Sequence, residues 1–256
     1  MSKSILILLA ICGLEISIMA QTIHHNEHES NAAFDVEFLD CSEFAGLTNV
    51  PTTKARKLVP AKFQLAGTAE NAVIVVRIAN CKAVSIGNYV ARNVTVAQVG
   101  ISINAPEGVG DINNYTLAYY TDSPLLMARL RTLGISAQFV PTLDYDYDRN
   151  AGRTGGQLTI RVPFPAAPRF SVLSAVQEPV AAAVPFRAIW WNDDGRKTVK
   201  MDTLLPSISF GGATTRLSTQ AESSLGKLIG GTTAMFPLFD SFNRFSVAQM
   251  RVRIVQ

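Results

Sequence analysis

Histidine is the side chain that most often transfers protons in enzymes, and its distribution in this chain excludes several mechanisms. The sequence contains three histidines, His24, His25 and His28, and all of them lie in a polar segment before residue 34. A Ser-His-Asp or Cys-His mechanism would therefore lack its usual general base in the folded part of the chain. A zinc hydrolase site would lack its usual ligands. The histidine segment could hold a divalent metal, but a solvated tail is the simpler interpretation, and we expect no metal site and no cofactor.

Three carboxylates alternate with two tyrosines in the run Asp-Tyr-Asp-Tyr-Asp at 144–148, a spacing that could suit a calcium ion. The EF-hand template needs glycine at its sixth position and glutamate at its twelfth, where this chain has Arg149 and Gly155. The alternation instead favours a strand with the aspartates on a solvent face and the tyrosines on the other, and a calcium or polar-ligand site of another kind is the alternative. Phosphate-binding glycine loops and a Gly-x-Ser-x-Gly elbow are absent from the sequence.

Lysine is the remaining candidate nucleophile, because desolvation or a neighbouring cation lowers the pKa of an amine and frees it for Schiff-base chemistry. Lys197 and Lys200 stand close to Arg196, directly after a turn-like Asp-Asp-Gly run. Lys54 and Lys57 lie with Arg56 on a short helix that is predicted at 54–59. None of these lysines shows a pattern typical of burial, so each is predicted to be a solvated charge.

Arg77 is the unusual residue of the chain, because it interrupts a strand built from valine, isoleucine and alanine. Alternation places it on one face with Val73, Val75, Ala79 and Cys81. A buried guanidinium group needs a carboxylate or phosphate partner. Arg77 is therefore expected either to form an ion pair inside the protein or to face a cavity and meet an anionic ligand.

The first residues have the pattern of a secretory signal peptide. A lysine at position 3 precedes an apolar run from Ile5 to Leu14, and a small residue, Ala20, stands at the expected cleavage point. Glu15 interrupts the run before the roughly 20 apolar residues that a spanning helix needs. The sequence therefore predicts a signal peptide at 1–20, a flexible polar tail at 21–33 and a single β-rich globular domain at 34–256. The expected location is secreted, or periplasmic in a bacterium, with no stable membrane anchor after cleavage.

Cys41 and Cys81 are the two cysteines left after removal of the signal, which carries Cys12. A disulfide between them is expected in an oxidising compartment, and two buried free thiols are the alternative. The triplets at Asn93 and Asn114 are glycosylation candidates if the host is eukaryotic. The net charge is only +3, and no basic cluster is interleaved with aromatic residues, so nucleic acid is not an expected partner.

Strand patterns dominate the rest of the chain. Ordered structure is expected to begin near Phe34, and the 72–81 strand has two apolar faces, which predicts a central position in a sheet. Further strands are predicted at 93–104, 114–120, 136–147, 157–164, 183–191, 197–202 and 245–255. The run Asn192–Gly195 is predicted to form a hairpin turn.

Helix signals are few. Ser123 is a predicted N-cap, Pro124 stands at the first helical position, and Gly134 ends the helix. A second helix is predicted at 219–229 with a capping box of Thr219 and Glu222. Strands outnumber helices and do not alternate with them, so the predicted fold is mainly β, an antiparallel barrel-like or sandwich sheet with two or three short helices.

Two segments resemble the acetoacetate decarboxylase-like β-barrel superfamily. The first is Ala-Arg-Lys-Leu-Val-Pro-Ala-Lys-Phe at 55–63, which precedes the strand Val-Ile-Val-Val-Arg-Ile. The second is the Pro124–Gly134 helix ahead of another strand series. The resemblance implies that family's barrel over most of residues 38–256. It also implies catalysis by adjacent lysines, but this sequence has no Lys-Lys pair, and Lys197 beside Arg196 is the nearest approximation.

Three functions follow as hypotheses. The first is a secreted, non-catalytic barrel-like domain that binds a small, largely apolar molecule, with Arg77 meeting an anionic or carboxylate end. The second is an acetoacetate decarboxylase-like lyase that acts through a desolvated lysine Schiff base. The third is an extracellular structural or interaction protein.

Overall fold

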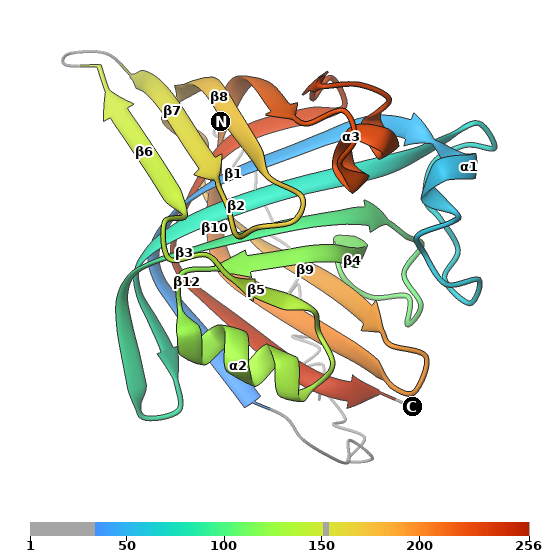
Figure 1. Cartoon of the computed structure of the whole chain (residues 1–256). Coiled ribbons are helices and arrows are strands. Elements are labelled where there is room, and N and C mark those ends of the chain that lie inside the picture. The colour runs from blue at the N-terminus through green and yellow to red at the C-terminus, as the bar shows by residue number, and fades with distance from the viewer. Residues whose placement is uncertain (1–33, 151–153, 256) are drawn as a thin grey trace, which may run out of the picture.

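A computed structural model of the chain describes residues 34–150 and 154–255 (Figure 1). The predicted signal peptide, the polar tail and the three histidines lie outside the described residues. The helices are α1 (Thr52–Ala55), α2 (Pro124–Thr132) and α3 (Ser224–Ile229). The strands are β1 (Phe34–Pro51), β2 (Asn71–Ile86), β3 (Tyr89–Ser102), β4 (Ile112–Thr121), β5 (Ala137–Phe139), β6 (Asp144–Arg149), β7 (Gly155–Val162), β8 (Phe170–Gln177), β9 (Val184–Asp193), β10 (Thr198–Thr219), β11 (Thr233–Met235) and β12 (Phe239–Val255).

The strands close into a ring. The hydrogen-bonded order runs β12, β1, β2, β3, β4, β9 and β10, and β10 pairs again with β12. Within this ring β4 and β9 are parallel, and the other pairs are antiparallel. The far end of β10 leaves the ring and pairs with β8, from which β7 and β6 continue as an outer sheet. The predicted mainly β, barrel-like fold is confirmed.

Both faces of strand β2 are covered by other parts of the protein. Its side chains at 73, 75, 77, 79 and 81 point inward, where the buried members pack with residues of β10, β12 and α2. Ile74, Val76 and Ile78 point outward and pack with buried residues of β7 and β8. The central position predicted for this strand is confirmed, because β2 pairs with β1 on one side and with β3 on the other.

Helix α2 covers part of the inward-facing core (Figure 1). It begins as predicted, because the Ser123 hydroxyl accepts a hydrogen bond from the Leu126 backbone N–H at 3.3 Å. Leu126 and Leu130 are fully buried among the inward-facing side chains of the ring. Gly134 follows the helix with φ of 88°, a conformation that glycine adopts without steric strain.

Some predicted elements are wrong in extent or kind. The strand predicted at 136–147 is two strands, β5 and β6, because a turn at Pro141 separates them. The helix predicted from Thr219 begins only at Ser224, because Thr219 is the last residue of β10 and Ser223 is the N-cap. Strand β8 was not predicted, and β10 extends far beyond the predicted 197–202.

The predicted disulfide is present and joins β1 to β2 inside the ring. Cys41 and Cys81 stand opposite each other in the strand register, with their Cα atoms 4.1 Å apart. Both residues are buried in the inward-facing core. Because the bond closes a loop of 40 residues, it restricts the unfolded chain and stabilises the fold.

We predict that removal of this disulfide lowers the free energy of unfolding by about 2–4 kcal/mol. The measurement is urea unfolding of the wild type and of the Cys41→Ala/Cys81→Ala variant, each with and without reductant. Reductant should lower the midpoint of the wild type and leave that of the variant unchanged. A wild-type midpoint that does not respond to full reduction would contradict the prediction.

Candidate functional site

The interior of the ring contains a cavity of about 510 Å³. Most of its wall is apolar and comes from strands all around the ring, including Leu47, Val75, Phe186, Trp190 and Leu205. A volume of this size lies within the range of small-molecule sites, roughly 300–1,000 Å³. The cavity is therefore large enough to hold a small organic molecule against apolar side chains.

Four polar side chains form a belt across neighbouring strands of the wall. Glu43 of β1 stands opposite Asn243 of β12, and Arg77 of β2 stands opposite Gln98 of β3. Arg77 Nε donates to Glu43 Oε2 at 2.5 Å, and Arg77 Nη1 donates to Gln98 Oε1 at 2.8 Å. Asn243 Nδ2 donates to the other Glu43 oxygen at 3.1 Å. We call Asn243, Glu43, Arg77 and Gln98 the polar belt.

The polar belt is buried, but one nitrogen of the Arg77 guanidinium group remains available to a ligand. Glu43 is 5% exposed and Asn243 is 1% exposed, and both carboxylate oxygens of Glu43 already accept hydrogen bonds. Arg77 keeps 13% of its side chain exposed and lines the cavity. Its Nη2 group donates to no residue in the described part of the chain. The belt therefore presents hydrogen-bond donors to the cavity while Glu43 balances the guanidinium charge.

A second polar pair, Ser102 and Asn114, lies farther along the strands in the same cavity wall. Ser102 of β3 donates to Asn114 Oδ1 of β4 at 3.1 Å, and both residues line the cavity. Asn114 is 1% exposed, and its Nδ2 group donates to no residue in 34–150 or 154–255. The cavity wall thus contains two separate buried polar positions, and the exposed Asp111 also borders it.

Two aromatic side chains complete the surroundings of the polar groups. Trp190 of β9 pairs with Asn114 of β4 in the strand register. A Cβ atom on Gly100 would lie 2.6 Å from the Trp190 ring, so position 100 requires glycine. Tyr119 is 1% exposed; burial raises its pKa, and the positive charge of Arg77 acts in the opposite direction. Tyr119 is therefore neutral and is no anionic partner for Arg77.

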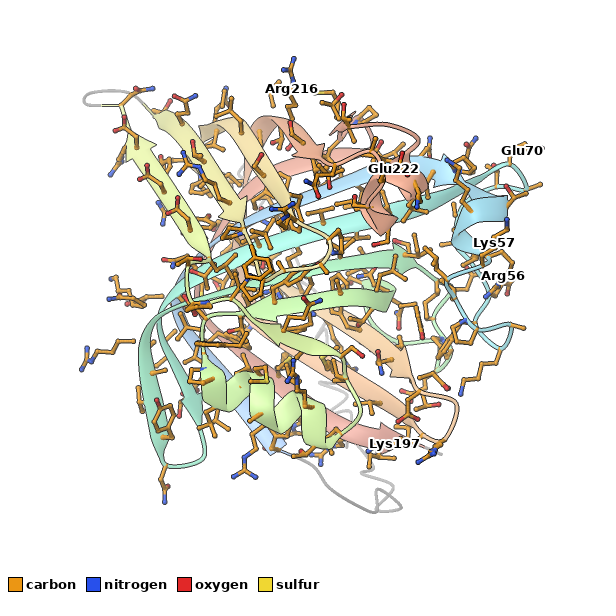
Figure 2. All side chains as sticks on the ribbon, in the orientation of Figure 1. Arg56, Lys57, Glu70, Lys197, Arg216 and Glu222 are labelled. Carbon is orange, nitrogen blue, oxygen red and sulfur yellow. A yellow bond between two sulfur atoms is a disulfide. The ribbon has the colours of Figure 1, made fainter. Side chains whose placement is uncertain are left out.

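No lysine of the described residues lines the cavity. Lys197 lies at the end of the β9–β10 hairpin, and Lys57 lies beside α1, both at the periphery of the molecule (Figure 2). The predicted hairpin is present, but its turn is shifted to residues 194–197, because Asn192 and Asp193 are the last residues of β9 and pair with β10. Gly195 in this turn has φ of 82°.

The prediction of a solvated Lys200 is wrong. Its side chain is only 11% exposed, and its Nζ contacts Glu107 Oε2 at 2.5 Å and lies 5.8 Å from the Trp191 ring centre. The physical reason is its place within β10, where alternation turns it toward Trp191 and the loop that carries Glu107 covers it. It lies on the opposite face of β10 from the cavity-lining Leu205.

The aspartate run forms the strand that the alternation predicts. Asp144–Arg149 is the edge strand β6, Asp144 pairs with Arg161 of β7 at 2.6 Å, and Tyr147 donates to Glu178. Within residues 34–150 and 154–255 no group of three or more His, Cys, Asp or Glu side chains is arranged to hold a metal ion.

The glycosylation candidates differ in position. Asn93 is exposed on β3, with φ of 53°. Asn114 is buried in the cavity wall, which leaves no room for a glycan on its amide in the folded barrel. No helix in the described ranges is long and apolar enough to cross a membrane.

Three members of the polar belt were not singled out from the sequence. Glu43 carries a weak signal, because it shares the inward parity of Cys41 and Leu47 in a strand of mostly apolar side chains. Gln98 and Asn243 carry none, because a neutral polar residue in a strand is common. Only the register between strands brings these residues to Arg77.

Solved structures of low sequence identity share this fold, whereas protein-family models and curated proteins yielded no match. An acetoacetate decarboxylase structure is 14% identical with a TM-score of 0.56, covering 86% of this chain and 88% of that chain. An acetoacetate decarboxylase-like enzyme from Sphingomonas wittichii RW1 is 10% identical with a TM-score of 0.55, covering 89% and 94%. The enduracididine biosynthesis enzyme MppR, complexed with pyruvate, is 13% identical with a TM-score of 0.53, covering 90% and 91%.

These likenesses define the class of fold. The chain has an acetoacetate decarboxylase-like barrel, as the two sequence segments predicted. At these identities the likeness concerns the fold and does not extend to the chemistry of the site.

We predict that Arg77→Gln lowers the free energy of unfolding by about 3–5 kcal/mol, because it leaves the Glu43 carboxylate buried without its partner. The double variant Glu43→Gln/Arg77→Gln should recover most of this loss, since it removes both charges and keeps an oxygen that can accept from Asn243. The measurement is urea unfolding at neutral pH, with Arg92→Gln on the exposed part of β3 as control. A double variant no more stable than the single one would show that the charge pair is not the cause.

Proposed function

We propose that this protein is a non-catalytic binding protein that holds a small, largely apolar molecule with a carboxylate group in the ring interior. The observation that carries the proposal is the polar belt, which presents a partly free arginine to a cavity with apolar walls and no lysine among its described lining residues. Export through the predicted signal at 1–20 is part of the same proposal. A disulfide inside the barrel accords with an oxidising compartment.

A carboxylate is the ligand group that suits Arg77 best. Guanidinium–carboxylate hydrogen bonds are charge-assisted and roughly twice as strong as neutral ones. Glu43 accepts from Nε and Gln98 accepts from Nη1, so a ligand carboxylate would accept from Nη2. The MppR structure, which shares the fold, was obtained with pyruvate, itself a small carboxylate. This accords with the proposal.

The apolar wall would hold the rest of the molecule. Phe186, Phe210 and Phe239 pack edge to face, with ring centres 5.8 and 6.2 Å apart, and all three line the cavity. Burial of ligand carbon against such surface stabilises a complex by about 25 cal/mol per Å² before the costs of association.

A lyase acting through a lysine Schiff base is the second candidate, and the decarboxylases among the similar structures favour it. That mechanism needs an amine in the cavity, and the described lysines lie elsewhere. The discriminating experiment is borohydride reduction in the presence of acetoacetate or pyruvate, followed by mass spectrometry of peptides. We expect no lysine adduct; a stoichiometric adduct would replace the binding proposal with the lyase.

We predict that decanoate, used as a probe, binds the wild type and binds Glu43→Gln/Arg77→Gln about 10- to 100-fold more weakly. This factor corresponds to the roughly 1.5–3 kcal/mol of a hydrogen bond to a charged group. The measurement is isothermal titration calorimetry, with Arg92→Gln as a control that removes an arginine at an exposed site. Equal affinities for wild type and double variant would overturn the role of Arg77. Absence of binding to the wild type would overturn the proposal and favour a structural or interaction protein.

A further inference from the structure

The cavity has a second polar position beyond the polar belt, and its distance from the belt follows from strand geometry. Gln98 and Ser102 lie four residues apart on the same inward face of β3. At about 3.3 Å per residue, the two levels are about 13 Å apart along the strand. Gln98 contacts Arg77, and Ser102 contacts Asn114, so the two polar positions belong to different ends of the cavity.

The wall between these positions is apolar. Val75 stands opposite Gly100 in the register, midway between the two levels. The Trp190 ring lies against Gly100 and also lines the cavity. A ligand that spans both polar positions therefore needs an uncharged hydrocarbon body between two polar ends.

The side chain of Asn114 suits a hydroxyl group. It is 1% exposed, so a polar atom on it without a partner is costly. Ser102 contacts one side of the amide at 3.1 Å, and the other side has no partner in the described residues. A hydroxyl can both donate and accept, so it can satisfy the amide whichever way the amide group stands.

We infer that the cavity recognises a carboxylic acid with a hydroxyl at the far end of its hydrocarbon chain, with the carboxylate at Arg77 and the hydroxyl at Asn114. The inference rests on the proposed function and names its ligand class. The orientation follows from the strands: Asn114 lies close to Asp111 and Ile112, where β4 begins and where exposed Asp111 borders the cavity. The carboxylate thus lies deeper and the hydroxyl nearer the rim.

The test compares decanoate with its ω-hydroxy derivative by calorimetry. We expect the hydroxy acid to bind the wild type about threefold to tenfold more tightly, as one net hydrogen bond of roughly 0.5–1.5 kcal/mol allows. In Asn114→Leu the preference for the hydroxy acid over decanoate should vanish or reverse, because the amide that receives the hydroxyl is gone. Arg92→Gln should keep the preference of the wild type.

A chain-length series in the wild type keeps the inference testable if Asn114→Leu fails to fold. The gain from the ω-hydroxyl should peak near the length that spans about 13 Å and fall for shorter and longer acids. Equal affinity for plain and hydroxylated acids at every length, with binding still dependent on Arg77, would overturn the inference and leave the proposed function standing. Failure of the wild type to bind either series would overturn the proposed function itself.

Discussion

The Glu43–Arg77 ion pair is the interaction around which the interior of the barrel is arranged. A charge in the middle of a closed ring of strands is stable only if a partner and hydrogen bonds replace the water it loses. Glu43 supplies the partner, and Gln98 and Asn243 supply the hydrogen bonds. Each comes from a neighbouring strand, so the belt requires the strands to hold their register. The same requirement leaves Nη2 of Arg77 as the donor that a ligand can use.

The position of the belt also divides the interior into two regions. On one side lie the disulfide, the buried leucines of α2 and the close-packed inward core. On the other side of the belt the side chains do not fill the interior of the ring, and the cavity remains. A disulfide between the two strands that carry Glu43 and Arg77 fixes their mutual position close to the ion pair, because Cys41 and Cys81 stand directly opposite each other.

The likeness to solved structures concerns the fold of this protein and leaves the chemistry to its own side chains. The barrel resembles that of acetoacetate decarboxylases and an acetoacetate decarboxylase-like enzyme. A barrel of this kind supplies an enclosed apolar interior, and the reaction or binding depends on the few polar side chains that point into it. Here the polar side chains that line the cavity are an arginine, a glutamate, an aspartate, a serine and two amides.

The sequence by itself determined the elements whose signals are local. The strand around Arg77 was predictable because both of its faces are apolar, and α2 was predictable because Ser123, Pro124 and Gly134 mark its ends. Tertiary structure decided the rest. Strand β10 was underestimated because Pro206 and Gly211–Gly212 resemble breaks, yet a register shift after Leu205 and a close approach to the Gln177 backbone accommodate them. The partners of Arg77 could not be predicted, because contacts between residues 21 or more positions apart depend on strand pairing and register, which local patterns do not specify.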